Sequence, residues 1–279
     1  MHGPARVAVL TVLAMLAFAG NSLLCRAALR DTGLDAASFT SVRLASGAAM
    51  LAILMLVRGH RPWASGTWRA AAMLFAYAAF FSFAYRQLTA ATGALLLFGA
   101  VQLTMLGCGL AWGERLGGVQ WLGLLAALAG LVGLLLPGLA APPLQAALFM
   151  LAAGSAWGVY SLLGRGATDP VGGTAGNFLR AVPFAIVLSA STAAHANLDP
   201  AGIAYAVASG AITSGLGYVL WYAVLPAFKA TSAATVQLSV PVLATAGGAL
   251  LLAEPISLRL LIASIAILGG IALVIVRRA

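Results

Sequence analysis

Long runs of apolar residues, separated by short polar turns, occupy almost the whole chain. The runs lack the strict alternation of a half-buried strand and are about 20 residues long. A hydrocarbon core about 30 Å thick requires about 20 residues of helix at 1.5 Å per residue. The pattern therefore predicts ten membrane-spanning helices, at approximately 6–28, 37–57, 68–88, 91–112, 117–136, 143–163, 173–192, 199–223, 229–252 and 257–276.

Composition supports the same fold class. Apolar residues make up 62% of the 279 residues and charged residues 8%, against roughly 45–50% and 25% in soluble domains. Lipid must therefore face most of the surface, and in lipid every backbone polar group needs an internal partner. The chain is predicted to be an all-α membrane protein with the lipid bilayer as its main surroundings.

The net charge of +9 comes from basic residues that lie singly near the ends of the apolar runs. This distribution lacks the clustered basic face that binding to nucleic acid requires. Alternate loops divide the basic residues unequally, and short cytoplasmic loops retain the excess. Both termini are therefore predicted to be cytoplasmic. The predicted inside set is Arg6, Arg58, Arg61, Arg69, Arg115, Arg165, Lys229, Arg277 and Arg278, and the outside set is Arg30, Arg86 and Arg259.

An internal repeat divides the chain into two parts. Residues 90–116 align without gaps on residues 230–256, each block being a small-residue helix start, a full span and a glutamate at the exit. Upstream, residues 39–43 similarly match residues 176–180. Five helices per repeat place the second repeat upside down relative to the first, an arrangement typical of carriers that alternate access around a midplane site. The predicted halves are 1–138 and 139–279.

These residues also carry a family resemblance. Gly113-Glu114-Arg115-Leu116 and Ala253-Glu254-Pro255-Ile256, together with Trp157-Gly158 and Pro241, resemble the drug/metabolite transporter superfamily in its EamA-type ten-helix branch. Within that branch the chain looks most similar to bacterial exporters of aromatic and other neutral amino acids. The resemblance implies an inner-membrane, multi-pass carrier that exports such metabolites by alternating access. The chain departs from the family pattern at Gly20-Asn21-Ser22, where Trp-Gly is common, and at Val101, which aligns with Pro241.

The resemblance also implies a cavity between the first, third, fourth, sixth, eighth and ninth helices. Amide and phenol groups there could bind an amino and a carboxyl group, while aromatic walls suit an apolar side chain. Any one of these aromatic residues is equally compatible with an interfacial belt. The candidate substrate-binding residues are Asn21, Ser22, Tyr77, Phe81, Tyr85, Gln102, Trp157, Tyr160, Tyr218, Tyr222 and Gln237.

Four charged residues near helix ends are candidates for gating or for structural anchoring. Arg43 and Arg180 lie six or seven residues inside their helices, where each would cost about 2.5–3.5 kcal/mol at a helix centre, although the long stem can snorkel outward. Glu114 and Glu254 are expected to pair with neighbours such as Arg115 and Arg259, or to act as latches on opposite faces.

The acidic residues and the missing motifs narrow the function. All six carboxylates fall in loops or at helix ends, which favours a neutral or zwitterionic substrate moved by facilitated diffusion or exchange over a proton relay. The sequence lacks the metal, nucleophile and phosphate-loop motifs of enzymes and ATP-driven pumps, so neither catalysis, a cofactor, a metal nor ATP binding is expected. A multidrug, nucleoside or other metabolite transporter of the same superfamily remains an alternative, as does a channel-like uniporter. No motif indicates an oligomeric state.

Overall fold

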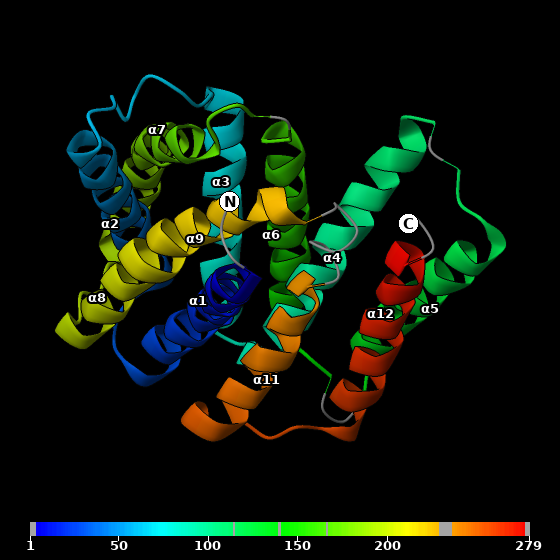
Figure 1. The fold of residues 1–279 in the computed structure, drawn as a ribbon. Coiled ribbons are helices and arrows are strands. Elements are labelled where there is room, and N and C mark those ends of the chain that lie inside the picture. Colours follow the sequence, from blue (N-terminus) through cyan, green and yellow to red (C-terminus); the bar gives the residue numbers. More distant parts are fainter. Residues whose placement is uncertain (1–3, 114, 139–140, 166, 229–235, 277–279) are drawn as a thin grey trace.

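The computed structural model describes residues 4–113, 115–138, 141–165, 167–228 and 236–276. These residues form ten helical segments, and no strand occurs among them (Figure 1). The segments are α1 (Pro4–Asp31), α2 (Ala36–Val57), α3 (Trp68–Tyr85), α4 (Ala90–Ala111), α5 (Gly118–Leu135), α6 (Leu144–Leu163), α7 (Pro170–Ser191), the continuous α8–η2–α9 (Pro200–Val207, Ala208–Leu216, Gly217–Val224), α11 (Ser239–Leu252) and α12 (Leu258–Val276); the short turns η1 (Ala193–His195) and η3 (Leu225–Ala227) precede α8 and follow α9.

The predicted fold class, an all-α membrane protein, is confirmed. Eight of the described helices are long and apolar enough to cross a membrane. Their outer faces carry bare apolar side chains such as Leu122, Val187 and Ile265, which are more than half exposed. Water would make such a surface costly, whereas lipid does not.

Three of the predicted spans differ in detail from the observed helices. The third begins as expected, but α3 ends at Tyr85. In the ninth, residues 229–235 lie outside the described residues and α11 has 14 residues, from Ser239 to Leu252. The eighth span contains a π-helical stretch, η2, which widens the helix locally and which hydropathy alone cannot reveal.

The helix packing is symmetric between the two predicted halves. Pairing the first helix with the sixth, the second with the seventh and so on relates the most extensive helix contacts to one another: α2 packs on α7, α4 on α11, and α5 on α12. The same pairing relates the α3–α6 contact to the contact of α1 with the α8–η2–α9 span. Figure 1 shows α5 and α12 side by side at the edge of the bundle, where they meet the other helices mainly through α4.

Glycines allow two of these pairs to approach closely. A Cβ atom at Gly154 of α6 would lie 2.5 Å from the carbonyl oxygen of Leu97 in α4. Across the α5–α12 pair, a Cβ at Gly123 would lie 2.5 Å from the carbonyl oxygen of Gly270. Backbones at this separation leave no room for a side chain, so small residues decide where these helices cross.

The ends of α4 and α11 share a backbone feature that supports the sequence repeat. Gly113 has φ of +90° and Ala253 has φ of 50°, so both helices end in a left-handed residue just before a glutamate. At the end of α11 the Glu254 amide donates to the carbonyl oxygen of Gly248, 3.0 Å away, and the turn directs the chain back toward α4. Glu114, the candidate at the other exit, lies outside the described residues.

The helix connections divide into two sets at opposite ends of the bundle. One end, called the latch end here, carries connections 32–35, 86–89, 192–199 and 253–257, several of which are bonded to one another. The opposite end, called the vestibule end, carries connections 58–67 and 164–169, at the top of Figure 1. The site lies between these two ends.

Candidate functional site

A central cavity with an empty volume of about 420 Å³ lies between helices of both halves. Residues of α1, α3, α4, α6, η2 and α9 contribute to its wall, as does Gln237 just before α11. These are the helices that the family resemblance placed at the centre. The lining residues are Phe18, Asn21, Ser22, Tyr77, Phe81, Leu97, Phe98, Trp157, Thr213, Ser214, Tyr218 and Gln237.

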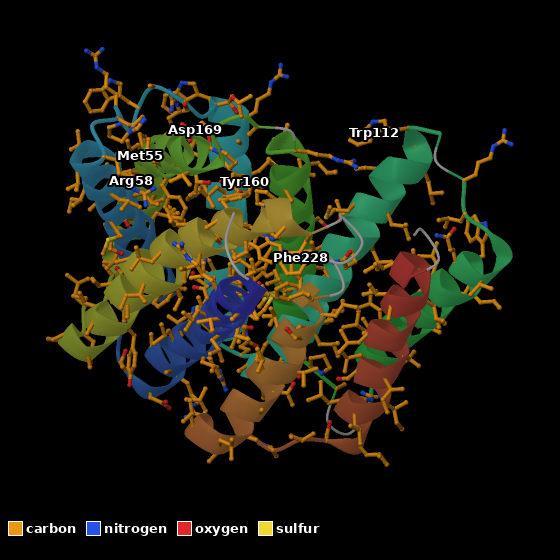
Figure 2. The ribbon with its side chains drawn as sticks, in the orientation of Figure 1. Met55, Arg58, Trp112, Tyr160, Asp169 and Phe228 are labelled. Atoms are coloured by element: carbon orange, nitrogen blue, oxygen red, sulfur yellow. The ribbon has the colours of Figure 1, made fainter. Side chains whose placement is uncertain are left out.

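A second cavity, the vestibule, opens at the vestibule end and has an empty volume of about 710 Å³. It lies between the start of α3, the end of α6, the start of α7 and Tyr222 of α9. Figure 2 places Tyr160 and Asp169, which both line it, toward the same end of the bundle as Arg58. Its wall includes Ser65, Thr67, Tyr160, Asp169, Thr174, Asn177 and Tyr222.

The candidate binding residues from the sequence therefore separate into groups. Most line the central cavity: Asn21, Ser22, Tyr77, Phe81, Trp157, Tyr218 and Gln237.

Four candidates lie elsewhere. Tyr160 and Tyr222 line the vestibule. Tyr85 is fully buried, with its ring 4.7 Å from that of Phe81, and its hydroxyl donates to the carbonyl oxygen of Ala90. Gln102 is half-buried on α4 and belongs to the wall of neither cavity.

An aromatic layer separates the two cavities. The ring of Trp157, in the central cavity, lies 5.3 Å from that of Tyr160, in the vestibule, and 5.2 Å from that of Tyr218. Tyr222 follows Tyr218 by one turn of α9 and reaches the vestibule. Rings from α6 and α9 therefore lie between the two cavities.

A chain of hydrogen bonds runs along one wall of the central cavity. The Asn21 amide donates to the Tyr77 hydroxyl (3.0 Å) and accepts from Ser209 (2.6 Å). Arg43 donates from Nη2 to the same Tyr77 hydroxyl (3.0 Å) and from Nε to Ser214 (3.3 Å). The chain joins α1, α2, α3 and η2, so the polar wall is assembled from both halves of the molecule.

Three polar residues near this wall were not predicted from the sequence: Ser209, Thr213 and Ser214. All three lie in the π-helical stretch η2 and are buried. Small hydroxyl residues inside an apolar span are common and normally bond to their own helix, so they carry no distinctive signal. The π-helical turn is what directs this face of the eighth span to Asn21 and Arg43.

The expectation that Arg43 snorkels toward the membrane surface is wrong. Its side chain is 1% exposed, and its Cζ lies 5.0 Å from the ring centre of Tyr77 and 4.9 Å from that of Phe81. Tyr77, Phe81 and Ser214 hold the guanidinium beside the cavity that they line. Its Nη1 atom has no hydrogen-bond partner among the described residues. Lining residues that accept hydrogen bonds keep the side chain inside the bundle.

Arg180, the equivalent residue in the second half, has a different environment. It donates from Nη1 to the carbonyl oxygens of Ser65 (2.7 Å) and Gly176 (3.0 Å), and from Nη2 to that of Trp63 (3.2 Å). These bonds fasten the α2–α3 connection to α7. Of the two predicted roles for Arg180, gating and structural anchoring, these contacts fit anchoring.

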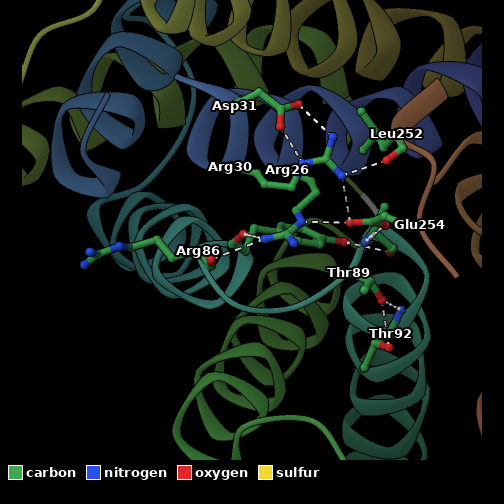
Figure 3. Close-up of polar contacts among 10 residues, drawn as sticks. Arg26, Arg30, Asp31, Arg86, Thr89, Thr92, Leu252 and Glu254 are labelled. Atoms are coloured by element: carbon green, nitrogen blue, oxygen red, sulfur yellow. Dashed lines mark hydrogen bonds and ion pairs between the residues drawn. The ribbon is translucent and has the colours of Figure 1, made fainter. Parts of the chain in front are cut away.

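Glu254 lies at the centre of a polar cluster at the latch end (Figure 3). Its Oε1 accepts from Arg26 Nε at 2.8 Å, and its Oε2 accepts from the amide of Ala90 at 2.7 Å. The same Arg26 donates to the carbonyl oxygens of Tyr85 and Arg86, at 3.0 and 3.2 Å. One ion pair therefore ties together the ends of α1, α3, α4 and α11.

The prediction that Glu254 pairs with Arg259 was wrong. Arg259 instead donates to the carbonyl oxygen of Leu136, 2.8 Å away. Proximity along the chain suggested Arg259, whereas the true partner is 228 positions distant in the sequence. Arg30 adds to this cluster, since it pairs with Asp31 and donates to the Leu252 carbonyl at 2.8 Å. We call Arg26, Arg30, Asp31 and Glu254 together the latch.

Two aspartates at the latch end reinforce this closure by joining the α1–α2 and α7–α8 connections. Asp35 accepts from the amide of Asn197 (3.0 Å), and Asp199 accepts from the amide of Gly33 (3.3 Å). Burial alone would raise the pKa of Asp35, but hydrogen bonds from Ser38 and from backbone amides outweigh it and lower the pKa. Backbone hydrogen bonds, led by that from Gly202, lower the pKa of Asp199. Both groups are therefore ionised near neutral pH.

Comparison with known proteins supports the membrane-carrier architecture. The chain is 62% identical over 275 residues to uncharacterized protein PA1977 of Pseudomonas aeruginosa, covering 98% of this chain and 96% of that protein. A solved structure, described only as a crystal structure of a protein, aligns over 97% of this chain and 96% of its own, with a TM-score of 0.66 at 20% identity, and is thus similar in fold. The EamA-like transporter family model matches residues 144–276, which span α6 to α12. The chain belongs to the EamA-like transporter family.

Proposed function

We propose that this transporter carries small neutral or zwitterionic metabolites, with aromatic amino acids the favoured substrates, across the bacterial inner membrane by alternating access. The central cavity is the observation that carries the proposal. Its polar wall, built around Asn21 and Tyr77, faces the rings of Phe18, Trp157 and Tyr218. Polar groups on one side and aromatic rings on the other are the lining that a small ligand with a polar head and an apolar body requires.

Unequal closure of the two ends supports alternating access. The latch binds four helix ends together at one end, whereas the vestibule reaches the aromatic layer from the other. The symmetric packing of residues 1–138 and 139–279 supports treating them as inverted repeats that exchange these two arrangements. In this proposal the latch and the aromatic layer open in turn and are never open together.

The charge distribution gives the orientation of this state. Basic residues favour the connections at the vestibule end, and by the positive-inside rule that end faces the cytoplasm, as do both termini. In this proposal the structure is an inward-facing state, in which the vestibule faces the cytoplasm and only the aromatic layer separates it from the central cavity. An impermeant thiol reagent should reach a cysteine placed at Thr174, in the vestibule wall, only from the cytoplasmic side.

No carboxylate belongs to the wall of the central cavity among the described residues. A proton-coupled carrier usually places such a group where proton and substrate compete. We therefore propose facilitated diffusion or exchange. Strict dependence of substrate movement on a pH gradient in liposomes would contradict this mechanism.

The substrate class is tested by thermal unfolding of the purified protein with each of the twenty amino acids. A ligand that binds only the folded protein stabilises it by RT ln(1 + [L]/Kd), and so raises the midpoint more the tighter it binds at a given concentration. Phenylalanine, tyrosine and tryptophan should give the largest increases, and Trp157→Ala should reduce them. Increases confined to other solutes, such as nucleosides, would overturn the amino-acid assignment.

A further inference from the structure

Arg43 is a buried cation that forms no ion pair with any residue that the structure describes. Its hydrogen-bond partners, Tyr77 and Ser214, are both neutral, and its Nη1 atom is unpartnered among the described residues. Burying a charge in this way is costly, and natural proteins normally compensate it with a counter-ion. Tyr77, Phe81 and Ser214, which position the guanidinium, all belong to the wall of the central cavity. The missing counter-ion is therefore expected inside that cavity.

A second free donor lies beside it. The Tyr77 hydroxyl accepts from both Asn21 Nδ2 and Arg43 Nη2, so its own proton is used in neither bond. Ser209 donates to the Asn21 oxygen and thereby fixes the direction of that amide. A neutral donor, the Tyr77 hydroxyl, therefore lies in the cavity wall, and a charged donor, the Arg43 guanidinium, lies directly behind it.

We propose that Arg43 Nη1 and the Tyr77 hydroxyl bind the carboxylate of the transported substrate. Two adjacent donors, one of them a guanidinium, match the two oxygens of a carboxylate. The substrate class is then a small organic acid with an apolar body, amino acids included, and the α-amino group is not required. The proposal rests on the proposed function and deepens it, because it names the group of the substrate that the site recognises.

The alternatives fit the site less well. An uncharged ligand would leave the charge of Arg43 without a counter-ion, and a cation would be repelled by it. A phosphate ester carries about two negative charges, and Arg43 is the single buried arginine packed against the residues of the wall among those described. A site built around such donors should reject an analogue that lacks the carboxylate.

The test uses the full-length protein in detergent and four related probes. L-phenylalanine and 3-phenylpropionate carry the carboxylate, whereas L-phenylalaninamide and phenethylamine do not. Binding of each is measured by isothermal titration and by the shift in thermal unfolding. In the wild type the two carboxylates should bind at least about 10-fold more tightly than the two analogues, because a charge-assisted hydrogen bond is lost with the carboxylate.

Variants assign this discrimination to the guanidinium. Arg43→Gln should abolish the preference for carboxylates, and Arg43→Lys should retain part of it because the charge remains. The matched control is Arg180→Gln, which removes the equivalent arginine of the second half and should keep the wild-type preference. Should the Arg43 variants fail to fold, Tyr77→Phe removes the neutral donor alone, and its binding of the two carboxylates should weaken several-fold.

The outcomes separate this inference from the proposed function. Equal binding of L-phenylalanine and L-phenylalaninamide by the wild type would overturn the carboxylate site, even if the amino acid is transported. Binding of 3-phenylpropionate but not of any amino acid, lost in Arg43→Gln, would support the site and overturn the amino-acid assignment. Failure of every carboxylate to bind would overturn both.

Discussion

Replacing Glu254 by glutamine removes one charge from the latch and leaves its shape almost unchanged. The amide oxygen can still accept from the Ala90 amide, so the loss falls on the ion pair with Arg26, whose side chains are 12% and 5% exposed. Removing one partner of a fully buried pair costs about 3–5 kcal/mol. Arg26 keeps two carbonyl acceptors and some solvent, so the value of one charged hydrogen bond, about 1.5–3 kcal/mol, is the better guide.

If the latch forms only in the state described here, that free energy shifts the equilibrium between the two states. A change of 1.4 kcal/mol is tenfold, so the population open at the latch end should rise about 10- to 150-fold. Ser22→Cys in the cavity wall, in a background with Cys25 and Cys108 replaced by alanine, reports this population. An impermeant maleimide applied from the latch side should label Glu254→Gln faster by that factor.

The matched control is Arg259→Gln. This arginine also bonds a backbone carbonyl at the latch end but takes no part in the latch, so its labelling rate should equal that of the parent. The reasoning is refuted if Glu254→Gln, folded with an unchanged helical content, labels no faster than the control.

Three further predictions concern stability. The folded-state pKa values of Asp35 and Asp199 are lowered, so the stabilisation that these groups give is complete above the unfolded carboxyl pKa of about 3.9 and is lost as pH falls through the lower folded values. The thermal midpoint should therefore hold from pH 7 to 5 and fall below about pH 4. The fall should be less steep in Asp35→Asn, and an equal fall in that variant would contradict the assignment. Gly154→Ala places its Cβ 2.5 Å from a backbone carbonyl and should cost about 1–3 kcal/mol in thermal unfolding, whereas Gly133→Ala, with nothing within 4 Å, should be neutral or slightly stabilising; equal effects would count against close α4–α6 packing. Arg180→Gln should speed hydrogen exchange in residues 59–67, because three bonds to carbonyls are lost, and unchanged exchange there would argue against anchoring.

Sequence reasoning succeeded where the membrane imposes a length. Apolar runs of about 20 residues gave the helices. The inverted repeat inferred from residues 90–116 and 230–256 stays a prediction. The aromatic part of the cavity was also foreseeable, because Tyr77, Trp157 and Tyr218 are conspicuous polar or bulky groups within apolar spans.

The remainder depends on geometry that hydropathy does not encode. The turn at η2, which brings Ser209 and Ser214 to Asn21 and Arg43, arises from a local change in helical pitch. Likewise the partner of Glu254 comes from the crossing of α1 and α11, which brings together residues far apart in sequence. Matching repeat positions did not imply matching surroundings either, since Arg43 is buried beside the cavity and Arg180 binds a loop.

The central claim is that the cavity belongs to a carrier with two alternately closed ends, and counterflow tests it most directly. Proteoliposomes loaded with unlabelled L-phenylalanine are diluted into a trace of the labelled amino acid, with Glu254→Gln and protein-free liposomes in parallel. A carrier should accumulate label transiently above equilibrium, with a rate that saturates as internal substrate increases. Linear, non-saturating entry without an overshoot would indicate a channel, and absence of entry for every carboxylate tested would contradict the account.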